Sequence, residues 1–557
     1  MAADHAAQPA ARAAGTALAA ARRLAARHAL TLAMAAVMLA AASPQLLGGM
    51  RDVGTIEEWG IYHLFDTQGV VWWTYTSDAL RPHSIRPFTV VPHGVGYLLT
   101  ADSFVGLQVV QTVCLALQAA AMTWLLRTLG AGLPLAGAGG ILFALYPALD
   151  QAFVTRSVHI HWTSACVVGA AALLMWMTRD RVTPLRAAAM MGAQAVGLMT
   201  YEAHYSVVVF VPLLLWAVAA GGTGRRIRLG LLWFVVPVLN GIRILLFMAS
   251  GTPVYQEGIA QEQGRSIQEF VDLAGRVFRG MAAVVRPPYG WGVGAVALAV
   301  VVLGVAVVIL GRDARATASW RTMAITGVVA ALIAPVCALV YAAQPVHLLD
   351  PLRIFAVASI PATVATVALL AAVSRRVPSL ELPLAVLLVV GVALGAQSQR
   401  SYWHERTQAI EHTLGAVSIA SAADGDDRPI VVVDEAQVTG RDGFTLPGLL
   451  LGSGLSYLGD RAPVAAMCLA GQTEPIPPYL PGIPPCVATP QGTRMDGAPP
   501  EPDAHVFVLR RSSRPSRPSP EILARLTSRQ RNVLRCIGVD GCAAGPHGLV
   551  AVPEPAP

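Results

Sequence analysis

The sequence predicts an all-α polytopic membrane protein with about eleven transmembrane helices and a small C-terminal α/β extracytoplasmic domain. The first observation is composition: of 557 residues, 55% are hydrophobic and 13% are charged, and the mean hydropathy is +0.56. Water-soluble domains are less apolar and carry more charge. The second is a series of apolar stretches with short polar connections, most of them close to the ~20 residues that cross ~30 Å of hydrocarbon.

The apolar stretches divide the chain into four expected parts. The predicted spans are residues 28–47, 104–126, 133–149, 161–177, 185–201, 205–220, 229–249, 292–310, 322–343, 354–372 and 379–396. The parts are a cytoplasmic N-terminal tail (1–27), a transmembrane domain (28–396) with a first outer loop (48–103), an extracytoplasmic α/β domain (397–545) and a disordered tail (546–557). The tail is assigned from its prolines.

The arginines set the expected orientation, because basic residues in short loops stay on the cytoplasmic side. All 40 basic residues are arginine; four precede the first span, and groups of them fall at every second connection, near residues 127, 179–186, 225–228, 312–321 and 375–376. We therefore expect a multi-pass protein of the cell membrane with its N-terminus in the cytoplasm. The basic, apolar start also has features of a secretory signal, so cleavage of the first span stays open.

The C-terminal region has the pattern of a small α/β domain. Strands are expected at 429–434 and 505–509, and helices at 446–457 and 521–531. Four of the seven cysteines lie here: Cys468, Cys486, Cys536 and Cys542. An exported domain favours disulfides. Of the three possible pairings we prefer the one that joins cysteines close in sequence. No catalytic motif is found in this region.

The first outer loop concentrates the polar and aromatic side chains of an otherwise apolar chain. It contains the carboxylates of Glu57 and Glu58, the indoles of Trp59, Trp72 and Trp73, and the guanidinium of Arg86. Three more charged residues lie at outer ends of spans: Glu202, Arg243 and Arg353. Ion-coupled transporters place binding groups near the midplane, where this chain offers only amides. The pattern therefore favours chemistry at the outer face.

Two further groups have simpler interpretations. His159 and His161 are two residues apart, so on a helix they point to different faces, and no third ligand is adjacent. We therefore expect no metal and no cofactor. Residues 267–281 have apolar positions at helical spacing and predict an amphipathic helix at the membrane interface. The net charge of +7 comes from arginines in short loops, so we expect a lipid bilayer as a partner and no nucleic acid.

Several short motifs, in order, resemble the GT-C superfamily. They are Glu57-Glu58-Trp59, Arg86-Pro87-Phe88, Ala144-Leu145-Tyr146-Pro147, Tyr201-Glu202 and Arg353-Ile354-Phe355 followed by Pro361. The superfamily consists of integral-membrane glycosyltransferases that use polyprenyl-phosphate sugars, and the similarity is greatest to protein O-mannosyltransferase-like members. It covers residues 28–375. This chain departs from the family where Glu57-Glu58 replaces a frequent Asp pair, and where Asp150-Gln151 replaces a frequent Glu.

The resemblance implies transfer of a sugar from a polyprenyl-phosphate donor to an extracytoplasmic acceptor, which could be a protein, glycan or lipid. A carboxylate would activate the acceptor hydroxyl, and arginines would stabilise the departing phosphate. The expected catalytic residues are Glu58, then Glu57, with Glu202. The expected phosphate ligands are Arg86, Arg243 and Arg353. The expected sugar-binding residues are Trp59, Trp72 and Trp73.

Other interpretations remain open at this point. The protein could be a GT-C-like membrane scaffold without catalysis, or a transporter of lipid-linked or small solutes. Each arginine could instead pair with a nearby carboxylate such as Asp350 or Glu202, and the tryptophans could form an interfacial aromatic belt. The sequence does not name the sugar, the acceptor or the oligomeric state.

Overall fold

The computed structural model describes most of the chain. The described residues are 28–48, 54, 57–217, 222–251, 267–312, 317–339, 355–424, 430–434, 454–459, 464–469, 486–489, 492–495, 505–512, 520–534 and 548–553.

The chain is a helical membrane protein. In the described residues, seven helices are long and apolar enough to cross a membrane: His28–Gly48, Val105–Leu129 (α4), Thr155–Arg179 (containing η4, Thr155–Ser157, and α6, Val158–Arg179), Thr223–Ala249 (α10), Trp320–Ala338 (α14), Phe355–Arg376 (α16) and Pro378–Ala422 (η9, Pro378–Leu380, and most of α17, Glu381–Asp424). Three shorter apolar segments are Leu133–Ala144 (α5), Glu202–Ala217 and Ala295–Gly311 (α13). Each predicted span overlaps a helix, and a count of eleven crossings stays a prediction.

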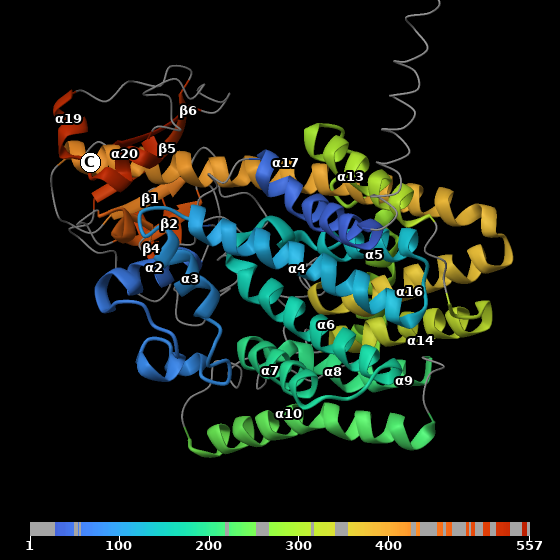
Figure 1. The fold of residues 1–557 in the computed structure, drawn as a ribbon. Helices are drawn as coiled ribbons and strands as arrows, with labels where there is room; N and C mark the ends of the chain where they lie inside the picture. Colours follow the sequence, from blue (N-terminus) through green and yellow to red (C-terminus); the bar gives the residue numbers. More distant parts are fainter. Residues whose placement is uncertain are drawn as a thin grey trace, which may run out of the picture.

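The helix α5 lies at the centre of the bundle (Figure 1), and all its side chains are buried. It packs against α4, α13, α16 and α17. Its glycines allow this approach: a Cβ on Gly140 would lie 2.1 Å from Thr123 Oγ1 and 2.4 Å from the carbonyl oxygen of Ala119. Small residues let helix backbones come close in a membrane, where packing replaces the hydrophobic effect between helices.

The segment from Glu202 to Ala217 is broken into short pieces. They are η5 (Glu202–His204), α8 (Tyr205–Phe210), η6 (Val211–Leu213) and α9 (Leu214–Ala217). Pro212 at the start of η6 has no N–H to donate and so interrupts the helix. The segment follows α7 (Pro184–Thr200), and α10 lies along the edge of the bundle beyond them (Figure 1), with many exposed apolar side chains.

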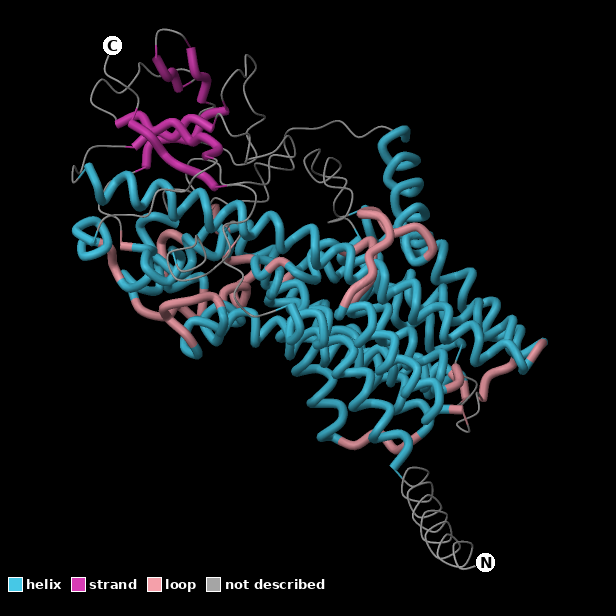
Figure 2. Tube along the Cα trace, turned by 90° about the horizontal axis from the view of Figure 1, so that it is seen from above, coloured by secondary structure: helices cyan, strands magenta, loops and turns pink. Residues whose placement is uncertain are grey.

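One end of the bundle, called here the loop end, carries α2 (Glu57–Gln68), η1 (Thr74–Thr76), η2 (Arg81–His83) and α3 (Val91–Leu99) together with the β-strands (Figures 1 and 2). The remaining short helices are η3 (Asp150–Phe153), α12 (Ile267–Met281) and η7 (Ala282–Val284). The predicted amphipathic helix is α12: Leu273 and Val277 are buried, whereas Phe270 and Phe278 are exposed.

The last helix of the bundle continues without a break to the sheet. The predicted domain boundary at residue 397 falls inside α17, which runs from the bundle to the strands (Figure 1). No proline follows Pro383 in this helix. Its apolar part continues directly into an amphipathic part in which Ile410 and Leu414, one turn apart, are buried. The end of the bundle and the sheet therefore share one helix.

The strands form one mixed sheet of order β4-β3-β2-β1-β5-β6. They are β1 (Ile430–Asp434), β2 (Val464–Leu469), β3 (Cys486–Thr489), β4 (Gly492–Met495), β5 (His505–Ser512) and β6 (Gly548–Pro553). The two predicted strands are confirmed as β1 and β5, and they pair in parallel, with Ile430 opposite His505. The strands β4 and β6 form antiparallel edges.

The predicted helix at 521–531 is divided into α19 (Pro520–Arg525) and α20 (Ser528–Leu534). The division arises from a capping box: Thr527 Oγ1 accepts from the Gln530 amide at 3.1 Å, and Gln530 Oε1 accepts from the Thr527 amide at 2.8 Å. Each side chain satisfies a backbone donor that the helix start leaves unpaired, so a new helix begins there.

The predicted disulfides stay predictions. Cys468 and Cys486 directly precede Leu469 and Val487, which face each other in the paired strands β2 and β3. Cys536 and Cys542 lie outside the described residues. The three cysteines of the bundle are free thiols: Cys114, Cys166 and Cys337.

The crossing of α3 and α4 depends on glycine and provides a test. A Cβ on Gly106 would lie 2.1 Å from the carbonyl oxygen of Gly96. We expect Gly106→Ala to destabilise the protein by about 1–3 kcal/mol, because backbone cannot yield as a side-chain tip can. Thermal unfolding in detergent measures the change. The matched control is Gly169→Ala in α6, where a Cβ meets nothing within 4 Å. Equal stability of the two variants would contradict this account of the crossing.

Candidate functional site

Glu58 lies on the first turn of α2, and its side chain is fully buried. Thr155 Oγ1, in the short helix that leads into α6, donates to Glu58 Oε1 at 2.6 Å. A buried carboxylate is costly unless it is hydrogen-bonded, so this contact fixes α2 to the start of α6. Glu57 belongs to the same turn of α2, and its side chain lies outside the described ones.

Tyr62, one helical turn after Glu58, is a site residue that the sequence analysis missed. Its ring is buried, and its hydroxyl finds no partner among the residues that the structure describes. Burial, followed by the neighbouring phenol of Tyr457 and the charge of Glu58, raises the pKa of Tyr62 well above its usual range. The phenol therefore stays protonated beside the carboxylate. The four-residue spacing on α2 is the signal that could have paired the two residues.

The three tryptophans of the loop have different environments. Trp59 is 1% exposed, its Nε1 donates to the Gly54 carbonyl at 2.7 Å, and its ring packs edge-on against Phe104. This burial does not support the prediction that Trp59 stacks on a sugar. Trp72 and Trp73 are 37% and 47% exposed and remain available for stacking.

Arg86 and Glu202 meet across 116 residues of sequence. The Arg86 Nη2 donates to Glu202 Oε1 at 2.7 Å, its Nε pairs with Oε2, and its Cζ lies 4.6 Å above the Tyr201 ring. The side chains are 18% and 19% exposed. Of the two interpretations of Arg86, the pairing with Glu202 is the one that the structure contains. Arg353 lies outside the described residues.

The Arg243 side chain extends from α10 to the loop end, where it donates hydrogen bonds to backbone carbonyls of the first outer loop. Its Nη1 donates to Tyr75 Oη at 2.6 Å and to the Ser84 carbonyl at 3.2 Å, and its Nη2 donates to the Ile85 carbonyl at 2.7 Å. Its Nε donates to Asn240 Oδ1 at 2.8 Å. These partners are all neutral. Within the described part of the chain, no carboxylate hydrogen-bonds to Arg243, so its charge is solvated by dipoles alone.

Four buried rings, those of His93, His159, Tyr201 and His204, form a row near the start of α6. His93 stacks on His159 with ring centroids 6.1 Å apart, His159 lies 5.2 Å from Tyr201, and Tyr201 lies 5.9 Å from His204. His159 is one helical turn after Thr155, and Tyr201 contacts Arg86. The row therefore runs from α3 past the first turn of α6 to Tyr201, which contacts Arg86. Among the described residues, no group of three metal-ligating side chains is placed to hold an ion.

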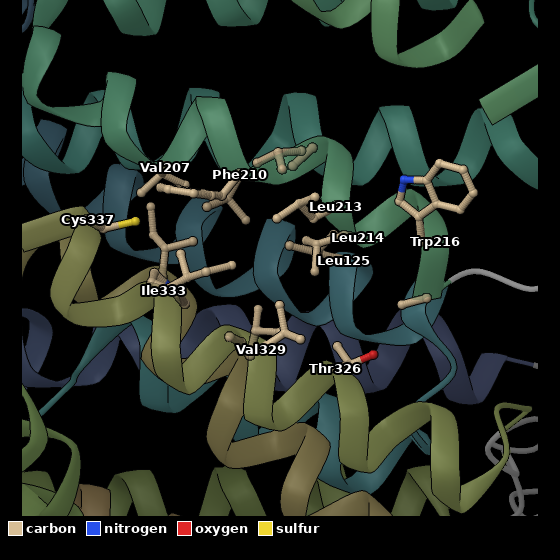
Figure 3. A pocket seen from close by; sticks show the side chains of 18 of the residues that line it. Leu125, Val207, Phe210, Leu213, Leu214, Trp216, Thr326, Val329, Ile333 and Cys337 are labelled. Carbon is tan, nitrogen blue, oxygen red and sulfur yellow. The ribbon is translucent and has the colours of Figure 1, made fainter. Parts of the chain in front are cut away.

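A pocket of about 540 Å³ lies along the broken segment (Figure 3). Its walls come from α4, α6, α8, η6, α9, α14 and α16, and nearly all its lining side chains are apolar. Val207 and Cys337 lie at one end, and Trp216 and Thr326 at the other (Figure 3). The first end is the one nearer the loop end, because α8 begins there at Tyr205, three residues after Glu202.

The pocket and Arg243 are connected through consecutive residues of α8. Ser206 Oγ donates to the Cys337 carbonyl at 2.9 Å and so joins α8 to α14 at the pocket end. The preceding Tyr205 Oη accepts from Asn240 Nδ2 at 2.9 Å. Asn240 in turn accepts from Arg243. The start of α8 therefore contributes both to the wall of the apolar pocket, at Val207, and to the hydrogen-bonded chain that leads through Asn240 to Arg243.

The Arg86–Glu202 pair can be tested against an exposed pair in the same loop. We expect Arg86→Gln to destabilise the protein by about 2 kcal/mol, because Glu202 would keep its charge without a bidentate partner. The control is Arg81→Gln: Arg81 and Asp78 form an exposed pair at 3.1 Å, for which we expect about 0.5 kcal/mol or less. Thermal unfolding of both variants and of Glu202→Gln measures this. Similar losses for Arg86→Gln and Arg81→Gln would show that the pair does not hold the loop.

The comparisons with known proteins do not add to this geometry. No family model matches the chain, and no curated protein or solved structure matches it. The residues of the site therefore carry the functional argument alone.

Proposed function

We propose that the protein is a membrane glycosyltransferase of the GT-C type, which moves a sugar from a polyprenyl-phosphate donor to an extracytoplasmic acceptor. The observation that carries the proposal is the apolar pocket, whose lining residue Val207 lies two residues after Tyr205 on α8, the residue that Asn240 joins to Arg243. Its volume lies within the ~300–1,000 Å³ of small-molecule sites. An amphiphile with a hydrocarbon tail and an anionic head fits this arrangement, because the tail would meet apolar side chains and the head would meet Arg243, to which no carboxylate of the described residues hydrogen-bonds.

Arg243 is the residue best placed to receive the donor phosphate. Its present partners include two loop carbonyls, which a phosphate oxygen can replace as a stronger, charged acceptor. Arg86 lies on the same loop and already holds Glu202. In the proposed reaction Arg243 stabilises the negative charge that develops on the departing phosphate.

Glu58 is the proposed general base. The acceptor hydroxyl oxygen forms a bond to the anomeric carbon of the sugar, the bond from that carbon to the phosphate oxygen breaks, and the hydroxyl proton passes to Glu58. Glu58 is fully buried, so in this proposal the acceptor hydroxyl takes the place of Thr155 Oγ1, which donates to Glu58 at 2.6 Å in the structure. Trp72 and Trp73 are exposed in the same loop and would stack on the sugar.

The proposal includes an orientation. The N-terminus is cytoplasmic, eleven spans cross the cell membrane, and the loop end with the C-terminal α/β domain lies outside. The arginine alternation supports this orientation. A lipid-linked donor and an extracytoplasmic acceptor are the proposed partners, and no cofactor is required.

A scaffold without catalysis is the second candidate. It is favoured by the engagement of both described arginines in internal contacts: Arg86 with Glu202, and Arg243 with Tyr75 and two carbonyls. The two candidates differ in one outcome, which is turnover of a polyprenyl-phosphate sugar by the purified protein in liposomes. Transport of the intact donor without transfer would instead indicate a transporter.

The role of Glu58 makes the first functional prediction. We expect Glu58→Gln to lower the transfer rate by about 10² to 10⁴-fold, because removal of a general base has this effect. The amide keeps the side chain's size, and Thr155 can still donate to its oxygen, so folding should persist. Asp78→Asn is the control, because Asp78 is an exposed carboxylate of the same loop. Transfer by Glu58→Gln within a few-fold of wild type would remove Glu58 from the mechanism.

The second functional prediction concerns the pocket. Ile333 lines the pocket, and Ile333→Trp should fill part of it. Each methylene of a lipid tail that loses its burial costs about 0.8 kcal/mol, so we expect the KM for a long-chain donor to rise roughly tenfold or more. A donor with a short chain should be affected less. The matched control is Leu332→Trp, because Leu332 is exposed on the same helix and does not line the pocket. Equal KM values for the two variants would mean that the tail binds elsewhere.

A further inference from the structure

The C-terminal part of the chain rests directly on the helix that carries Glu58. Tyr457 inserts its ring among three aromatic rings of the loop end, with centroids 5.6 Å from Trp59, 5.8 Å from Tyr62 and 5.6 Å from Phe104. Its hydroxyl donates to the Ala101 carbonyl at 2.8 Å. Aromatic clusters of this kind contribute large buried areas and prefer defined ring angles.

Arg529 of α20 holds this contact electrostatically. Its Nη2 donates to Asp66 Oδ1 at 3.0 Å, its Nη1 pairs with Oδ2, and its Nε donates to Asp102 Oδ1 at 3.2 Å. Its Cζ lies 4.3 Å above the ring of Tyr457. Bidentate guanidinium–carboxylate pairs are among the stronger hydrogen-bonded contacts, and this one is largely shielded from solvent.

The same guanidinium and carboxylate are bound to three separate segments. Arg529 Nη1 donates to the Tyr457 carbonyl at 2.9 Å, and Tyr97 Oη of α3 donates to Asp66 Oδ1 at 2.6 Å. Burial, together with this hydrogen bond to Asp66, raises the pKa of Tyr97 to about 12. The phenol therefore remains a donor throughout the physiological range. Loss of a single partner leaves the other hydrogen bonds of Arg529 in place. Removal of the Arg529 guanidinium removes its contacts with Asp66, Asp102 and the Tyr457 carbonyl together.

We propose that Arg529 is a positioning residue, which clamps the C-terminal segment onto α2 and thereby keeps Glu58 in its buried place at the start of α6. Asp66 is eight residues after Glu58, roughly 12 Å along the helix. The Arg529–Asp66 pair holds one end of α2, and the contact of Tyr457 with Trp59 and Tyr62 holds the other. Two points of attachment fix the rotation of α2, and rotation decides whether Glu58 faces Thr155.

Hydrogen exchange of the α2 amides tests the clamp without any substrate. We expect Arg529→Gln to speed exchange in residues 57–68 by about tenfold or more, because the loss of charged hydrogen bonds lowers the free energy of local opening. The matched control is Arg525→Gln: Arg525 makes one exposed hydrogen bond, to the Ala422 carbonyl at 3.3 Å. If Arg529→Gln does not fold, Asp102→Asn removes the exposed partner only, and exchange should rise by a few-fold. Equal exchange in these variants and the Arg525→Gln control would overturn the clamp.

The positioning role rests on the proposed function and needs a kinetic readout. We expect Arg529→Gln to lower kcat about tenfold with the donor KM within about twofold, because the base is displaced while the pocket is untouched. Arg529→Lys, which keeps the charge but loses the bidentate geometry, should be intermediate. Faster exchange with unchanged kcat would overturn the positioning role while leaving Glu58 as the base. Absence of transfer by the wild type would remove the proposed function, and the exchange result would still decide the clamp.

Discussion

A charged side chain in an apolar helical bundle is stable only when a partner or a set of dipoles solvates it, and this constraint shapes the loop end. Glu58 is held by Thr155, Glu202 by Arg86, and Arg243 by loop carbonyls. Each contact joins segments far apart in the sequence. The path of residues 57–104 over the bundle therefore follows from the need to satisfy a few charges.

The same constraint separates the charged residues by the kind of partner they have. Arg86 is neutralised by a carboxylate, so its capacity for another anion is reduced. Arg243 is solvated by neutral oxygens, so it keeps a net attraction for an anionic group. This difference, which no count of arginines reveals, selects Arg243 as the centre of the proposed donor site.

The pocket is lined by one broken segment and by two helices that contain proline. Pro212 divides the segment between Glu202 and Ala217, and Pro335 and Pro361 lie inside the two helices that face it. Proline removes a backbone donor and its ring displaces the preceding turn. Aliphatic side chains of these elements line the pocket. The pocket therefore depends on how α4, α6, α14 and α16 pack against the broken segment, and each of these is an ordinary apolar stretch in the sequence.

The sequence by itself determined the class of the protein, the places of its apolar helices, the amphipathic helix α12 and the strands β1 and β5, because hydrophobic periodicity is a local property. It also singled out Glu58, Glu202 and Arg243 as polar residues in an apolar setting. Only the tertiary structure decided which partners these residues have. It also showed that Trp59 is buried, that α17 runs past residue 397, and that Tyr62, His93 and Arg529 belong to the loop end. Pairings such as Arg529 with Asp66 span hundreds of residues, and they form through the packing of the whole chain, which leaves no periodic trace along the sequence.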